Sequence, residues 1–194
     1  MPIPFIIGLI PLFLSPIWSG RLIQVALKSE RAQIAVDNAA ILAGRRDRET
    51  LNFLARRNVQ LRKLDAAHHA AHLCAYGPGA NTACVAADRA AEAAIQALRM
   101  ETIRNAEIQW FAASRAAQAE FHRVDDGRAF QSDRPLALRL DGVTCSVCGR
   151  KVTWELSEVP GYTFSSGELS TRVELLGESL SIPHWGYRLW EGSR

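Results

Sequence analysis

Four cysteines are the residues of this 194-residue chain whose type and spacing most directly suggest chemistry. They fall into two close pairs, Cys74 with Cys84 and Cys145 with Cys148. An even number of cysteines in local pairs predicts two disulfides in an oxidising compartment. Cys74 and Cys84 flank a Gly-Pro-Gly turn, so their disulfide would join the ends of two helices at a corner. Two free structural thiols are the alternative.

Cys145 and Cys148 form a CxxC motif followed by glycine, and this motif has several interpretations. It matches one half of a zinc knuckle, with His122 or His184 as further ligands, but the sequence contains no second CxxC half. A thioredoxin-type redox motif would begin a helix, whereas the flanking residues here predict strands. A small disulfide at a hairpin tip is the favoured interpretation, and a metal site, a redox role and free thiols stay open.

His68 and His72 lie four residues apart on one face of a predicted helix, close to Cys74. This spacing can ligate a metal. However, no carboxylate lies between the two histidines as the general base does in HExxH. Polar residues near a helix end are therefore the favoured interpretation, and the sequence predicts no metal and no cofactor.

The sequence contains none of the common catalytic motifs: GxSxG, a P-loop, GxGxxG and HExxH are all absent. The adjacent acids Asp125 and Asp126 precede a glycine, which predicts a turn. We therefore expect no enzyme. Charged residues make up 22% of the chain and the net charge is +3, without a basic stripe that alternates with aromatics. Nucleic-acid binding is excluded on the same grounds.

The N-terminal residues predict a membrane anchor. Residues 2–19 contain no Lys, Arg, Asp or Glu, and the apolar character resumes in "LIQVAL". About 20 such residues can cross a bilayer, with Trp18 and Arg21 at its interface. A cleaved signal peptide would need a basic first region, and three prolines disfavour a buried core helix. We predict a single uncleaved transmembrane helix over residues 1–27.

Two long helices are expected after the anchor, because apolar residues recur at steps of three and four. They predict an antiparallel hairpin over residues 28–122 with its corner at 75–83. Residues 123–135 contain Asp-Asp-Gly and Ser-Asp-Arg-Pro and predict a linker. Residues 136–194 alternate in polarity and predict a small antiparallel β-module of about four strands.

The expected fold class is therefore α+β: an N-terminal transmembrane helix continuing into a long antiparallel helical hairpin, followed by the β-module. A sheet this small buries little apolar area. We therefore expect Trp154, Trp185 and Trp190 to pack against a helix or a partner.

The compartment is predicted from two opposing signals. Basic residues follow the span and none precedes it, which favours a cytoplasmic body by the positive-inside rule. The paired cysteines favour an oxidising compartment. We predict an inner-membrane anchor with a periplasmic or extracellular body.

The segment "RAQIAVDNAAILAG" resembles the region that follows the membrane span in TadE/TadG-type proteins, the pilin-like membrane components of tight-adherence (Tad) pilus systems. The residues that match this pattern are Arg31, Gln33, Asp37, Ala39, Ala40, Ala43 and Gly44. The resemblance covers roughly the first quarter of the chain. Two departures are the missing basic residues before the span and the missing Gly-x-x-x-x-Glu prepilin cleavage motif.

The resemblance implies a membrane-anchored, pilin-like structural or assembly component of a bacterial envelope pilus or secretion apparatus, without catalytic activity. Its expected partners are the lipid bilayer and other pilin-like or assembly subunits, as a homo- or hetero-oligomer formed through the N-terminal helix. The residues expected to pack helices together are Gln33, Asp37, Asn38, Ala39, Ala40 and Gly44. The alternative function is a membrane-tethered zinc-binding or redox module that uses the CxxC motif at 145–148.

Overall fold

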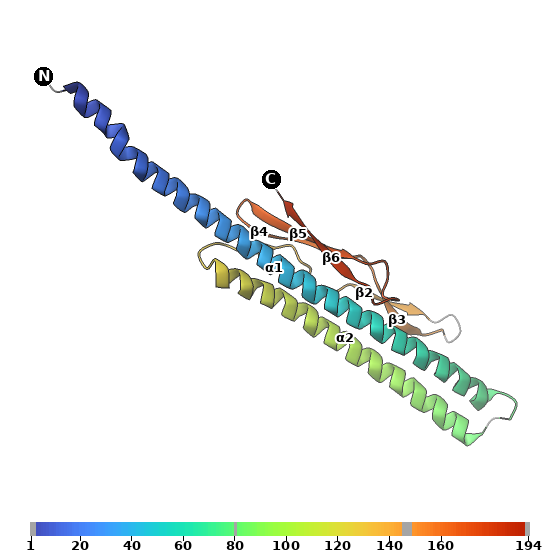
Figure 1. Cartoon of the computed structure of the whole chain (residues 1–194). Coiled ribbons are helices and arrows are strands. Elements are labelled where there is room, and N and C mark those ends of the chain that lie inside the picture. The colour runs from blue at the N-terminus through green and yellow to red at the C-terminus, as the bar shows by residue number, and fades with distance from the viewer. Residues whose placement is uncertain (1–2, 80, 145–148, 193–194) are drawn as a thin grey trace.

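The computed structural model describes residues 3–79, 81–144 and 149–192, and their side chains from residue 20 to residue 190. The fold is α+β, with two long helices and antiparallel strands. In Figure 1, α1 (Ile3–Tyr76) runs between α2 (Thr82–Val124) on one side and the strands on the other. The predicted α+β class with a helical hairpin and antiparallel strands is confirmed.

The described strands form two antiparallel sheets. One has four strands in the order β1-β4-β5-β6, and the other pairs β2 with β3. Their bounds are β1 (Gln131–Ser132), β2 (Leu140–Thr144), β3 (Lys151–Leu156), β4 (Gly161–Ser166), β5 (Leu169–Leu176) and β6 (Gly186–Gly192). The predicted module of about four strands is smaller than the observed one, which has five strands among the described residues between 136 and 192. Strand β4 is the one without a clear sequence signal, because Val159-Pro160-Gly161 at its start and Ser165-Ser166-Gly167 at its end are typical of turns. Its buried residues are Tyr162, Phe164 and Ser166.

Local residues explain the corner between the helices. Gly77 N donates a hydrogen bond of 2.8 Å to Leu73 O, and Pro78 follows, so α1 ends here. A Cβ at position 77 would collide with the same carbonyl oxygen. Asn81 then caps α2, since its side-chain oxygen accepts a hydrogen bond of 2.9 Å from Cys84 N. Across the corner, Cys74 and Cys84 form a disulfide, as predicted.

Small side chains let the three layers pack closely. Between residues 32 and 43, five alanines of α1 are completely buried, and large side chains from α2 and the four-stranded sheet fill the space around the helix. The buried alanines are Ala32, Ala35, Ala39, Ala40 and Ala43, and the large side chains include Trp110, Phe121, Tyr162, Phe164 and Val173. The middle of α1 is therefore buried both on the face toward α2 and on the face toward the four-stranded sheet.

Two asparagines of α1 attach the strand region to the helix. Asn58 accepts a hydrogen bond of 3.0 Å from Trp154 N and donates one of 2.7 Å to Trp154 O. Asn52 does the same for Trp185, at 3.0 and 3.3 Å. Each side-chain amide thus pairs with the backbone N–H and C=O of one tryptophan, as an adjacent strand would. It satisfies groups that would otherwise be costly to bury.

The three tryptophans of the strand region differ in their packing. Trp154 and Trp185 do pack against α1, whereas Trp190 on β6 is 51% exposed.

Among the described residues, no helix contains an apolar stretch long enough to cross a membrane. The transmembrane helix predicted for residues 1–27 therefore has no support in the structure.

Candidate functional site

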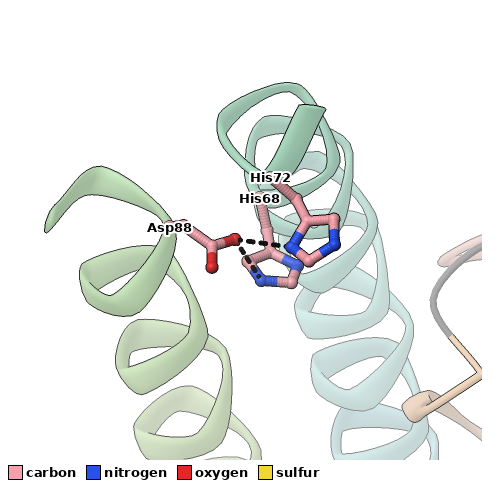
Figure 2. A group of neighbouring side chains, drawn as sticks. All are labelled: His68, His72 and Asp88. Carbon is pink, nitrogen blue, oxygen red and sulfur yellow. Dashed lines mark hydrogen bonds and ion pairs between the residues drawn. The ribbon is translucent and has the colours of Figure 1, made fainter. Parts of the chain in front are cut away.

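Two histidines and one carboxylate meet between the helices near the corner. Figure 2 shows the imidazoles of His68 and His72 on α1 directed toward the carboxylate of Asp88 on α2. His68 Nε2 lies 3.0 Å from Asp88 Oδ1, and His72 Nδ1 lies 3.3 Å from the same oxygen. These three donor atoms all lie within 4.8 Å of one another. We call His68, His72 and Asp88 the histidine cluster.

The helices and the disulfide position this cluster. Four residues make slightly more than one helical turn, so His68 and His72 occupy one face of α1. Asp88 follows Cys84 by four residues on the antiparallel helix, and the disulfide fixes α2 against α1 at this end. His68 and Asp88 are buried, whereas the side chain of His72 is 52% exposed. The cluster is thus fixed on its inner side and open to solvent on its outer side.

Charged residues from the strand region border the cluster. Arg150, just before β3, places Nη2 at 3.2 Å from His68 Nε2 and forms an ion pair with Glu92 of α2. Asp65, His68, Glu92 and Arg150 line part of a cleft between the two helices and β3. One nitrogen of His68 therefore faces both a guanidinium and a carboxylate.

A second buried carboxylate, Asp47, belongs to a different network. Arg134 donates two hydrogen bonds to it, with Nε at 3.0 Å from Oδ2 and Nη2 at 2.6 Å from Oδ1. The hydroxyl of Tyr162 donates a third. Burial raises the pKa of the Asp47 carboxyl above its usual value, while Arg134 and Tyr162 oppose that rise. All three side chains are core residues, so we regard this group as structural.

The residues predicted to pack helices together lie between α1 and the four-stranded sheet. Gln33 Nε2 donates to Asp37 Oδ1 at 2.8 Å, and Thr171 of β5 donates to the same oxygen at 2.5 Å. A Cβ at Gly44 would lie 2.7 Å from Cδ2 of Tyr187 on β6.

Ala39 and Ala40 are completely buried, and Asn38 is partly buried. The packing of these positions is therefore within the chain. A neighbouring subunit would have to contact the exposed side of this stretch, where Ile34 and Ile41 lie.

Among the described residues, the two histidines predicted as further zinc ligands lie outside the histidine cluster. Cys145 and Cys148 lie outside the described residues, so their predicted disulfide stays a prediction. His122, a proposed zinc ligand, lies near the end of α2, with Nδ1 at 3.9 Å from Asp126 Oδ1. His184 lies in the connection between β5 and β6.

Asp88 is the residue that sequence reasoning missed. The sequence position of Asp88 indicates its place in the cluster when the disulfide is used to align the two helices. Asp88 lies four residues after Cys84, and the position four residues before Cys74 is Ala70. Asp88 therefore falls opposite the point midway between His68 and His72. The histidines alone form an incomplete motif within one helix, and the third residue of the cluster comes from the second helix.

The part of α1 that precedes the body exposes apolar residues. Leu22, Ile23, Val25 and Leu27 are 66%, 59%, 65% and 51% exposed. Successive residues turn by about 100° around a helix, so these four side chains are spread around α1 and do not form one stripe. We call them the apolar collar. Lys28 and Arg31 follow it on the side of the body.

Comparison of the chain with family models, with curated proteins and with solved structures finds no match. The geometry of the chain itself therefore carries the functional argument, and the likeness to TadE/TadG-type proteins stays a prediction from the residues quoted above.

Proposed function

We propose that this protein is a structural or assembly component of a bacterial envelope pilus or secretion apparatus, anchored by the N-terminal part of α1 in the apolar interior of a membrane. The apolar collar is the observation that carries the proposal. Fully burying each of its four large side chains would contribute roughly 1.5–3 kcal/mol. Because they point in different directions around the helix, a single docking groove would cover only some of them.

The sequence and the shape of the molecule support a lipid environment for this segment. Residues 2–19 contain no charged residue, and Arg21 is the single charge between them and the collar. The long side chain of Arg21 can extend toward the headgroups, and Lys28 and Arg31 follow the collar where a membrane surface would begin. In Figure 1, the N-terminal part of α1 extends away from α2 and the strands. Lipid would surround this part of the helix on every side.

The rest of the molecule has the properties of a rigid building block. The disulfide closes one end of the hairpin, and the four-stranded sheet covers α1 over Gln33–Gly44. The segment that resembles TadE/TadG-type proteins therefore provides packing for the body. In this proposal the body projects from the membrane on the oxidising side, and subunits associate through α1 beside the collar.

Cysteine labelling in native membranes tests the proposal. Val25→Cys, in the collar, and Met100→Cys, on α2, are each introduced into the full chain with Cys145→Ser and Cys148→Ser. Met100 is the matched control because its side chain is 73% exposed. With a membrane-impermeant maleimide on spheroplasts, we expect labelling of Met100→Cys and protection of Val25→Cys until detergent is added.

Three results would overturn the proposal. The chain could remain in the supernatant after the membranes are sedimented, or the two cysteines could label equally. Labelling of Met100→Cys only after the spheroplasts are lysed would place the body in the cytoplasm, and the envelope function would then be wrong.

A further inference from the structure

We propose that the histidine cluster is a binding site for a divalent transition metal, with Zn²⁺ as the ion it best fits. His68 Nε2, His72 Nδ1 and Asp88 Oδ1 would be the protein ligands, and water would complete the coordination. Two imidazoles and a carboxylate suit Zn²⁺, and three protein ligands with an open position are one of its common arrangements. This site uses none of the collar residues and neither cysteine of the CxxC motif.

Two of the three separations between the ligand atoms agree with such a site, and the third is at most 4.8 Å. In a tetrahedral zinc site with bonds of about 2.0–2.1 Å, the ligand atoms lie about 3.3 Å apart. Asp88 Oδ1 is 3.0 Å from His68 Nε2 and 3.3 Å from His72 Nδ1. Small side-chain rotations would therefore bring all three atoms to one ion without moving either helix.

The hydrogen bonds around His68 provide an independent argument for a cation. Nε2 lies 3.0 Å from Asp88 Oδ1 and 3.2 Å from Arg150 Nη2. A neutral imidazole nitrogen either donates or accepts, so it cannot satisfy both neighbours. When Nε2 accepts from Arg150, its lone pair and the carboxylate oxygen repel each other. A metal ion bound to both atoms removes that repulsion once Arg150 has moved away from His68 toward Glu92.

The surroundings of the cluster favour binding and allow entry. Buried His68 and Asp88 are fixed by the packing of two helices, and the Cys74–Cys84 disulfide lies at the same end of the hairpin. Such preorganisation lowers the cost of collecting the ligands. The half-exposed ring of His72 leaves a path from solvent.

Arg150 opposes metal binding through its charge. Its guanidinium contacts the nitrogen that the metal would use, and it would have to move away. Because its side chain is 41% exposed and is also paired with Glu92, it can leave His68 while keeping an acidic partner. Arg150→Gln removes the competing charge, so we expect this variant to bind Zn²⁺ more tightly than the parent.

Isothermal titration with Zn²⁺ alone tests the site. The parent is the full oxidised chain with Cys145→Ser and Cys148→Ser, because two thiols would bind zinc by themselves. We expect one Zn²⁺ per chain, and His72→Ala should lower the affinity at least about tenfold. His69→Ala, one residue along the same helix and outside the cluster, is the matched control and should leave the affinity unchanged.

A second measurement protects the test against misfolding. His72 is half exposed, so His72→Ala should keep the circular dichroism spectrum and the metal-free Tm of the parent. Zn²⁺ should raise the Tm of the parent and of His69→Ala, since it binds the folded state, and should not raise that of His72→Ala. Binding of less than one Zn²⁺ per parent chain, or equal affinities for His72→Ala and His69→Ala, would overturn the site.

Discussion

Two buried aspartates of this molecule differ in what compensates their charge. Asp47 is completely buried and receives two hydrogen bonds from Arg134, a side chain that is always cationic, and one from Tyr162. Asp88 is nearly as buried but faces two imidazoles, one of which is half exposed. The first carboxylate is satisfied by fixed donors, whereas the second is surrounded by groups whose nitrogens can donate or accept.

The difference shows how to separate a structural charge from a candidate ligand. Arg134 is itself fixed, because its guanidinium lies 3.9 Å from the centre of the Trp110 ring and donates to Trp110 O at 3.0 Å. Nothing can enter between it and Asp47 without breaking the core. The histidine cluster opens to solvent and includes a nitrogen that its neighbours cannot satisfy together. Burial of a carboxylate alone therefore does not identify a ligand-binding site. Burial beside side chains whose nitrogens can either donate or accept a hydrogen bond does.

The largest expected effect comes from removing the cation beside Asp47. Arg134→Met should lower the free energy of unfolding by about 3–5 kcal/mol, because it leaves a buried carboxylate without its counter-charge. Urea unfolding followed by circular dichroism measures the loss. Met is chosen because it keeps much of the volume of the arginine side chain against Trp110.

The double variant Asp47→Asn with Arg134→Met is the control for this change. It removes both charges and leaves Tyr162 a neutral partner, so it should recover most of the lost stability. A single-variant loss below about 1 kcal/mol would show that Asp47 does not depend on Arg134, and the contrast with Asp88 would fail.

The next effect concerns the disulfide beside Asp88. Replacing Cys74 and Cys84 together by alanine should lower the free energy of unfolding by about 2–3 kcal/mol, the entropy of closing a loop of this length. The effect should be local. Amide hydrogen exchange should increase over residues 68–88 and stay unchanged around Asp47, which is held by the core.

Reduction of the parent chain with dithiothreitol should reproduce both results, while Cys145→Ser with Cys148→Ser should not. If exchange increased equally around Asp47 and Asp88, the hairpin would open as one unit. The two regions would then be no different in their local stability.

Local signals made the helical hairpin and its disulfide predictable. A glycine-proline corner, an asparagine cap and paired cysteines lie within a dozen residues of one another. The partners of the two aspartates were not predictable in this way, because Arg134 lies 87 residues from Asp47 and Tyr162 lies 115 residues from it. Strand β4 was missed for a related reason: its identity depends on pairing with β5, and its flanking turn residues gave the stronger local signal.

The smallest expected effect is a pH dependence confined to the Asp47 network. Burial and the neighbouring Asp47 charge raise the pKa of Tyr162 above that of a free tyrosine. The folded chain therefore keeps this proton where the unfolded chain loses it. The stabilisation is complete below about pH 10 and declines above it by about 1.4 kcal/mol per pH unit.

Tyr162→Phe removes this dependence, so the difference in stability between parent and variant should shrink as the pH rises from 10 to 11. Urea unfolding at several pH values measures it. Tyr76→Phe, which alters an exposed tyrosine near the histidine cluster, is the control and should follow the parent across this range. A constant difference between the parent and Tyr162→Phe would mean that Tyr162 ionises equally in the folded and unfolded chains. In that case the Tyr162 hydroxyl would not be held on Asp47 as a fixed donor. The contrast between the Asp47 network and the histidine cluster would then be wrong.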